Sequence, residues 1–406
     1  MIRSFRNSLT SQATLPDAEP DAVSVCVPAL PVGGQVRALD GIRGLAIFFV
    51  MIYHMAPGFP GHGFSARFLT RLFSSGWFGV DLFFALSGFL ITGILLDARG
   101  SADYFRSFYA RRMLRIFPLY YLVLFLVFFV TPAFDSSLYQ EARKDQAWFW
   151  LYLMNIPTAL RNFPYRSMNH LWSLAVEEQF YLLWPALVLW TSPRGMVRLC
   201  WCLVAAAFCS RVLLTSGQHA PMLVAAYTFT PCRSDGLACG ALAAASLRHA
   251  SALNPPGLWQ SRKLWLLLAL AVGGVFCFSS DVTFFNPVIE TIGISLLALF
   301  FGVSVGIAAV SHGRAATLLG CPPLALLGKY SYCMYIIHPA IYHLVSQGVA
   351  SVSPRFPFLR GHAGEWASMA ASLSTTMALA WMSWTCYESR WLSLKRYFPR
   401  SRTGKD

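Results

Sequence analysis

An arginine and a histidine stand eleven residues apart in the apolar segment over residues 40–57. Eleven residues make about three turns of an α-helix, so Arg43 and His54 project from nearly the same face, about 16 Å apart along the axis. An imidazole can take and return a proton near neutral pH. Two ionisable groups on one face of an apolar helix therefore predict a functional site. The structural alternative is a snorkelling Arg43 and a local hydrogen bond of His54.

Two adjacent carboxylates, Glu177 and Glu178, lie in the apolar stretch 170–185. Adjacent helical residues point about 100° apart, so the two carboxylates need separate partners. A carboxylate beside an imidazole raises its basicity and fixes its tautomer. We therefore expect a carboxylate of this pair to serve His54 in proton transfer. A purely structural ion pair is the alternative.

Three arginines, Arg111, Arg112 and Arg115, come at the start of the apolar segment 113–134. At this spacing we expect them on one side of a helix at the cytoplasmic interface. Guanidinium groups bind phosphate oxygens through two parallel hydrogen bonds, which suits the nucleotide end of coenzyme A. The alternative is topogenic charge that contacts lipid headgroups.

Further polar residues interrupt the apolar segments and are candidates for substrate contact. Asp81 is expected at a depth in the membrane similar to that of His54. A favourable charge at a helix N-terminus would account for this aspartate equally well. Arg233 and Asp235 are most economically an internal ion pair that lines a cavity. Tyr335 and His338 fall on one helical face, and such a polar stripe suggests a substrate wall.

The composition excludes a soluble domain. Hydrophobic residues make up 56% of the chain and charged residues only 12%, against about 25% charged residues in soluble domains. The net charge of +14 comes from Lys and Arg in short loops and at the C-terminus, which is the positive-inside pattern of membrane proteins and argues against nucleic-acid binding. The ten cysteines form no CxxC pair with a matching His or Cys cluster, so no metal site is expected.

The apolar segments predict an all-α, polytopic transmembrane helix bundle. About ten segments are expected to cross, one segment (147–160) to be re-entrant or interfacial, and both termini to be cytoplasmic. Residues 1–36 are expected to be a disordered cytosolic tail, 37–395 the transmembrane domain and 396–406 a basic cytosolic tail. The segments lie at 40–57, 77–97, 113–134, 147–160, 172–191, 196–215, 222–247, 263–280, 288–310, 325–349 and 366–387.

Taken in order, these motifs resemble the acyltransferase 3 family of bacterial integral-membrane O-acyltransferases. The resemblance covers residues 37–395. It is carried by Arg43-x10-His54, the stretch 78–89, Arg111-Arg112-x-x-Arg115, the stretch 171–181, Arg233-x-Asp235-Gly236 and Ser331-Tyr332-x-x-Tyr335-x-x-His338.

The resemblance implies transfer of an acyl group, with acetyl expected, from cytoplasmic acyl-CoA to a hydroxyl of a cell-surface or lipid-linked glycan. It implies catalytic roles for His54 and Glu178, and structural or CoA-binding roles for Arg43, Arg111 and Arg112. Glu178 is then expected to orient the imidazole of His54, and Glu177 to pair with another group, such as Arg233. It also implies a stand-alone form without a C-terminal hydrolase-like domain, in the bacterial inner membrane, with acyl-CoA as co-substrate and no permanently bound cofactor. Direct transfer and a transient acyl-His54 both fit the residues. A transporter or flippase is the alternative class.

Overall fold

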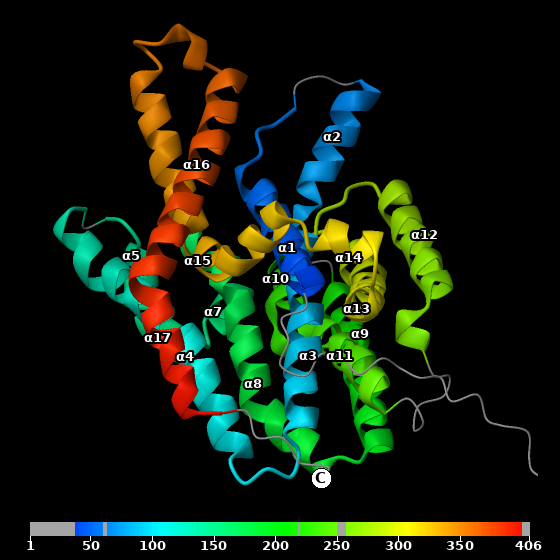
Figure 1. The fold of residues 1–406 in the computed structure, drawn as a ribbon. Helices are drawn as coiled ribbons and strands as arrows, with labels where there is room; N and C mark the ends of the chain where they lie inside the picture. Colours follow the sequence, from blue (N-terminus) through cyan, green and yellow to red (C-terminus); the bar gives the residue numbers. More distant parts are fainter. Residues whose placement is uncertain (1–36, 60–62, 136, 218–219, 250–256, 400–406) are drawn as a thin grey trace, which may run out of the picture.

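The computed structural model describes residues 37–59, 63–135, 137–217, 220–249 and 257–399, and every regular element within these ranges is a helix (Figure 1). The expected tail over residues 1–36 and most of the expected tail over 396–406 lie outside the described residues. The longer helices are α1 (Arg37–Met55), α2 (Phe64–Ser74), α3 (Gly79–Asp97), α4 (Tyr104–Phe125), α8 (Trp172–Trp190), α9 (Pro193–Thr215), α11 (Thr230–Arg248), α12 (Arg262–Phe278), α13 (Ile294–Val310), α15 (Pro322–Val352) and α16 (His362–Ser383). The shorter ones are α5 (Gln140–Lys144), α6 (Gln146–Trp150), α7 (Asn155–Leu160), α10 (Ala220–Thr228), α14 (Arg314–Leu319) and α17 (Ser389–Ser393).

Several helices have the length and composition of membrane spans, as the sequence predicts for a multi-pass membrane protein. A bilayer core needs about 20 apolar residues in a helix. Five segments among the described residues meet this need: Arg37–Met55, Phe64–Asp97, Tyr104–Ala133, Pro193–Thr215 and Ile289–Val310. The segment 147–160 forms only the end of α6 and the six-residue α7, which are too short to cross. The full number of crossings and the side of each terminus stay predictions.

Small residues bring α3 and α11 unusually close together at the centre of the bundle. A Cβ at Gly240 would lie 1.9 Å from the carbonyl oxygen of Ala85, and one at Gly88 would lie 2.0 Å from that of Leu237. Only glycine allows two helical backbones to approach in this way. Helix α11 also packs against α9 and α13, and α1 packs against both α3 and α15. The core of the protein therefore lies around α1, α3 and α11.

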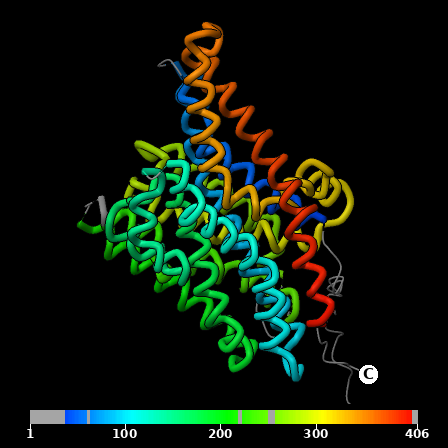
Figure 2. Tube along the Cα trace, turned by 90° about the vertical axis from the view of Figure 1, so that its left-hand side faces the viewer, coloured from blue at the N-terminus to red at the C-terminus, as the bar shows by residue number. Residues whose placement is uncertain are grey.

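Two features differ from the expected helices. The expected segment 222–247 is broken into α10 and α11, because Phe229 has an extended backbone (ψ 137°) and Pro231 opens α11 with no N–H to continue the earlier helix. In addition, α15 is 31 residues long, and the α15–α16 hairpin projects with α2 from one end of the molecule (Figures 1 and 2). The opposite end carries the connection between α3 and α4.

Candidate active site

Helices α1, α3, α4, α8 and α15 line a cavity of about 110 Å³ at the level of Arg43. Its charged lining consists of Arg43, Arg112, Arg115 and Glu177. Because three guanidinium groups face one carboxylate, this space favours an anionic or strongly polarised ligand group. The hydroxyl groups of its lining belong to Ser87, Ser173, Tyr181, Ser331, Tyr332 and Tyr335. We call it the arginine cavity.

A second cavity, of about 260 Å³, lies further along α1 at the level of His54. Its polar lining includes His54, His170, Arg166 and Asn169. Aromatic faces with a few polar groups are typical of small-molecule sites. The rings that line it are Tyr53, Trp77, Phe163, Trp172, Tyr227, Phe284 and Tyr335. We call it the histidine cavity.

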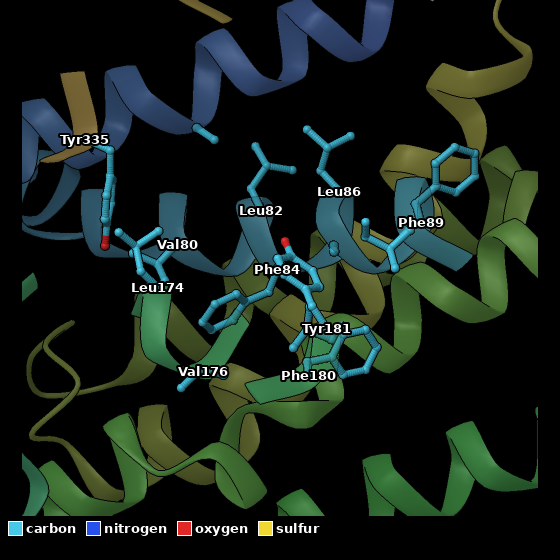
Figure 3. Packing of buried hydrophobic residues seen from close by; sticks show 14 of the residues in the cluster. Val80, Leu82, Phe84, Leu86, Phe89, Leu174, Val176, Phe180, Tyr181 and Tyr335 are labelled. Carbon is cyan, nitrogen blue, oxygen red and sulfur yellow. The ribbon is translucent and has the colours of Figure 1, made fainter. Parts of the chain in front are cut away.

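The two cavities share a wall. Val80 of α3 and Tyr335 of α15 line both of them. Figure 3 shows the Tyr335 ring beside Val80, with Leu174 of α8 next to it. The separation between the cavities is therefore about one side chain thick at this point. Along α1 the two ends of the site, Arg43 and His54, are about 16 Å apart.

The proline that follows His338 fixes the tautomer and the orientation of the His338 ring. Proline has no N–H, so the carbonyl of Tyr335 loses its partner within α15. Nδ1 of His338 lies 2.8 Å from this oxygen and donates to it. Nε2 of His338 is then an acceptor, and it is buried without a partner among the described residues. The proline thus creates the hydrogen bond that orients the imidazole.

His54 and His170 pack against the same imidazole. The ring centroids of His54 and His338 are 4.9 Å apart, and those of His170 and His338 are 5.1 Å apart. Nδ1 of His54 lies 2.8 Å from the carbonyl oxygen of Val50, and Nε2 of His170 lies 3.2 Å from that of Ile336. Each ring therefore donates one N–H to the backbone and keeps the other nitrogen as an acceptor. His170 and His338 are buried, whereas His54 is exposed and accessible to a substrate.

The three arginines of α4 do not share one environment. Arg112 stacks over the Tyr181 ring at 4.0 Å, and the Tyr181 hydroxyl is hydrogen bonded to Ser87. Arg112 and Arg115 line the arginine cavity. Arg111 instead donates to the carbonyl oxygens of Lys395 (3.0 Å) and Phe398 (2.8 Å). The structure therefore brings two of the three arginines together at the cavity, and the binding of phosphate by any of them stays a prediction.

The two adjacent glutamates have different surroundings. Glu177 lines the arginine cavity and interacts electrostatically with Arg112 and Arg43. Glu178 is absent from the described lining of either cavity and has no hydrogen bond to His54 among the described residues. The expected pairing of Glu178 with His54 is therefore not formed. Its neighbours are Arg112 and the tyrosines Tyr120, Tyr121, Tyr152 and Tyr332.

The remaining predicted substrate contacts form buried ion pairs behind the cavity wall. Arg233 pairs with Asp81 at 2.6 Å, and Asp235 pairs with Arg211 at 2.6 Å. The expected pairs of Arg233 with Asp235 and with Glu177 are thus both replaced. Neighbouring charges on one helix point in different directions, and each finds its partner on another helix. All four side chains are almost completely buried.

These ion pairs support the aromatic lining of the histidine cavity. The Arg233 guanidinium carbon lies 4.9 Å from the centre of the Tyr227 ring and 5.7 Å from that of Trp172. The Tyr227 ring in turn stacks on Phe284 at 4.1 Å. Glu290 is fully buried in the same region, and both of its carboxyl oxygens lack a hydrogen-bond partner among the described residues. Asp81 and Arg233 therefore position the cavity wall rather than line it.

Sequence reasoning overlooked four residues that the structure places in or beside the site. His170, Ser173 and Glu177 are three and four residues apart, which places them on one face of a helix. This spacing could have identified His170 and Ser173 from the sequence. Arg211 and Glu290 are single charges in apolar segments, and intramembrane charges are a recognised functional signal. Their partners lie on other helices and cannot be read from local spacing.

The fold and the two cavities define a helical membrane protein with a histidine-lined cavity at one level and an arginine-lined cavity at another. The sequence of residues 36–385 matches the acyltransferase 3 family, whose model is described as an acyltransferase domain. The match spans nearly the whole chain. The chain therefore belongs to the acyltransferase 3 family, as the motif resemblance predicts.

Curated relatives share this region. The chain is 28% identical to the peptidoglycan O-acetyltransferase OatA of Listeria monocytogenes over 337 residues, which covers 79% of this chain and 51% of the relative. It is 26% identical to the O-acetyltransferase OatA of Staphylococcus aureus over 348 residues, which covers 79% of this chain and 53% of the relative. The chain thus spans about half the length of the curated relatives it matches. No solved structure matches the chain.

Proposed function

We propose that this protein is a membrane O-acetyltransferase that moves an acetyl group from acetyl-CoA to a hydroxyl of a cell-surface glycan. The observation that carries the proposal is the shared wall of Val80 and Tyr335 between an arginine-lined and a histidine-lined cavity. Such an arrangement lets an anionic donor and a neutral hydroxyl acceptor approach the same point from two sides. The names of both relatives support the acetyl group, and the name of the Listeria monocytogenes relative supports a glycan acceptor.

The donor end of the reaction belongs in the arginine cavity. Arg112 and Arg115, which lie in the first half of the Tyr104–Ala133 span, bind the phosphates through charge-assisted hydrogen bonds. Arg43 lines the same cavity and adds its positive charge to the donor site.

The acceptor end belongs in the histidine cavity. Nδ1 of His54 donates to the backbone, so Nε2 is the acceptor that removes the proton from the glycan hydroxyl. The aromatic lining offers flat apolar faces to sugar rings, and Arg166 and Asn169 offer donors to sugar hydroxyls. Both direct attack on the thioester and a transient acyl-His54 proceed from this ring position.

The test uses everted membrane vesicles from cells that lack the gene and carry either the wild type or His54→Ala. Everted vesicles expose the cytoplasmic face, so radiolabelled acetyl-CoA reaches the donor side while the acceptor is the native membrane glycan. We expect labelled acetyl esters in the glycan fraction with the wild type only. Equal labelling in both would exclude His54 as the base. Absence of labelling, together with CoA-independent movement of glycan across the vesicles, would favour a transporter.

A further inference from the structure

The histidine cavity contains a guanidinium group that the protein leaves without a partner. Arg166 lines this cavity together with His54 and Asn169. The residue is exposed, and no hydrogen bond or ion pair joins its side chain to another of the described residues. The described lining of the cavity also includes no aspartate or glutamate. The acceptor site therefore presents a positive charge that its own lining does not neutralise.

Neighbouring cations in the connection between α4 and α8 do have acidic partners. Lys144 pairs with Glu141 at 2.8 Å, and Arg161 pairs with Asp145 at 2.5 Å. An unpaired cation is therefore not a general property of this connection. Arg166 differs from the other two because it faces a cavity instead of a carboxylate.

The backbone that carries Arg166 is held in an unusual conformation. The φ angle is 38° at Arg166, 53° at Asn162 and 57° at Phe163. Asparagine tolerates the left-handed region, whereas arginine and phenylalanine adopt it only where the surrounding structure imposes it. Strained backbone of this kind is concentrated at ligand-binding and active sites. The conformation therefore indicates that the segment is shaped for a ligand.

Side chains fix the segment from several directions. The Asn169 amide donates to the carbonyl oxygen of Phe163 at 2.9 Å, and its oxygen accepts from the N–H of Tyr165 at 2.9 Å. The Tyr165 hydroxyl donates to Asp145 at 2.8 Å. The Phe163 ring packs against Phe284, which also lines the cavity, at 5.7 Å. Arg166 thus extends from a rigid base, and a ligand pays little ordering entropy to bind it.

The chemistry of the lining favours a carboxylate as this ligand. One guanidinium binds one carboxylate through two parallel hydrogen bonds. A pyrophosphate carries more charge and calls for further cations, but the described lining includes no lysine and no arginine other than Arg166. The hydroxyl groups of a neutral sugar need no charged partner. An acidic sugar, in contrast, uses both the guanidinium and the aromatic faces of the cavity.

We propose that Arg166 selects an acidic acceptor, namely a glycan with a carboxylate on the sugar that is acetylated or on the sugar next to it. This inference rests on the proposed acetyl transfer to a glycan. The carboxylate binds Arg166 while the accepting hydroxyl meets Nε2 of His54 in the same cavity. Arg166 is therefore a specificity-determining residue and takes no part in proton transfer.

Binding is measured as protection of His54 against diethyl pyrocarbonate, in the purified full-length protein in lipid nanodiscs. Peptide mass spectrometry quantifies the modification of His54 separately from that of the other histidines. The probes are a disaccharide that contains glucuronic acid, its methyl ester, and glucose 1-phosphate. We expect the acid to protect His54 at a concentration about tenfold or more below that of either other probe. Equal protection by the acid and its ester, or stronger protection by the phosphate, would overturn the proposal.

Three variants assign the effect to the guanidinium. Arg166→Asn removes the charge with a residue that tolerates the left-handed backbone, and it should abolish the preference for the acid. Arg166→Lys keeps the charge but not the two parallel hydrogen bonds, so its preference should be intermediate. Lys144→Gln removes the same charge from the same connection and should keep the full preference. A preference for the acid that survives in Arg166→Asn would also overturn the proposal.

The acetylated product separates this inference from the proposed function. Glycan fragments that carry the acetyl ester are isolated from cells with and without the gene, and mass spectrometry gives their composition. We expect the gene-dependent acetyl esters on fragments with a carboxylate on the acetylated sugar or its neighbour. Esters on neutral fragments would overturn the acidic acceptor and leave the acetyl transfer intact. The lack of any gene-dependent ester would overturn both.

Discussion

Arg233 and Asp235 lie two residues apart on α11, and each forms its ion pair with a different helix. Arg233 binds Asp81 of α3, whereas Asp235 binds Arg211 of α9. The two pairs therefore connect three helices through one. Because Arg233 also lies against the aromatic lining of the histidine cavity, the stability of the bundle and the shape of the acceptor site depend on the same contacts.

Removing one partner of the Asp81–Arg233 ion pair should lower the free energy of unfolding strongly, whereas replacing both partners by apolar residues should lower it little. Asp81→Leu leaves a buried guanidinium without its partner, and we expect a loss of about 3–5 kcal/mol of unfolding free energy. The double variant Asp81→Leu/Arg233→Met should recover most of that loss. Thermal unfolding in detergent measures both. The exposed pair of Glu141 and Lys144 is the control, and Glu141→Gln should change stability by less than about 1 kcal/mol. A double variant as unstable as the single one would contradict the prediction.

The adjacent glutamates offer a matched comparison. Glu177 lines the arginine cavity and Glu178 does not. We expect Glu177→Gln to reduce kcat for acetyl transfer about tenfold or more, since the change removes a proton-accepting group from the donor side. Glu178→Gln should retain most of the activity. Both are measured at saturating acetyl-CoA after protein amounts are equalised. The reverse order of effects would show that the donor side is organised around residue 178.

Of the three arginines of α4, we expect Arg112 and Arg115 to bind CoA and Arg111 to stabilise the fold. Arg112→Gln and Arg115→Gln each remove charge-assisted hydrogen bonds, worth about 1.5–3 kcal/mol, from the donor site. We expect the KM or the dissociation constant for acetyl-CoA to rise about 10-fold to 100-fold. Arg111→Gln should leave CoA binding nearly unchanged and lower stability instead, because Arg111 holds the carbonyls of Lys395 and Phe398. Equal losses of CoA affinity in all three variants would refute this division.

His54 lines the histidine cavity and should be indispensable for activity, whereas a histidine outside the described lining of both cavities should not be. His54→Gln keeps a polar side chain but provides no base, and we expect kcat to fall about 100-fold or more. His312, which is exposed after α13, provides the control, and His312→Gln should have wild-type rates. The acetyl content of the surface glycan, measured by mass spectrometry, is compared between cells that carry His54→Gln and cells that carry His312→Gln. Full acetylation with His54→Gln would require another base.

The sequence supports the fold well and the site only in part. Apolar segment lengths locate most of the long helices, and Arg43, His54, Arg112 and Tyr335 are recognisable because ionisable or polar groups are rare in apolar helices. The choice between Glu177 and Glu178 depends on how α8 is rotated within the bundle, which local spacing does not determine. The partners of Arg233 and Asp235 come from α3 and α9 and are set by tertiary packing. The histidine cluster likewise brings together three segments of the chain.

The charges in the first two turns of α11 have a consequence for biogenesis. This helix is absent from the segments whose composition alone suits a bilayer, and a charge within a membrane helix opposes insertion, by about 2.5–3.5 kcal/mol where it lies at the centre. Asp81 and Arg211 precede it in the chain, so their helices leave the ribosome first. We expect α11 to enter the lipid phase together with α3 and α9 rather than alone. A nascent chain that lacks either partner would then stall at the translocon and become a target for membrane quality-control proteases.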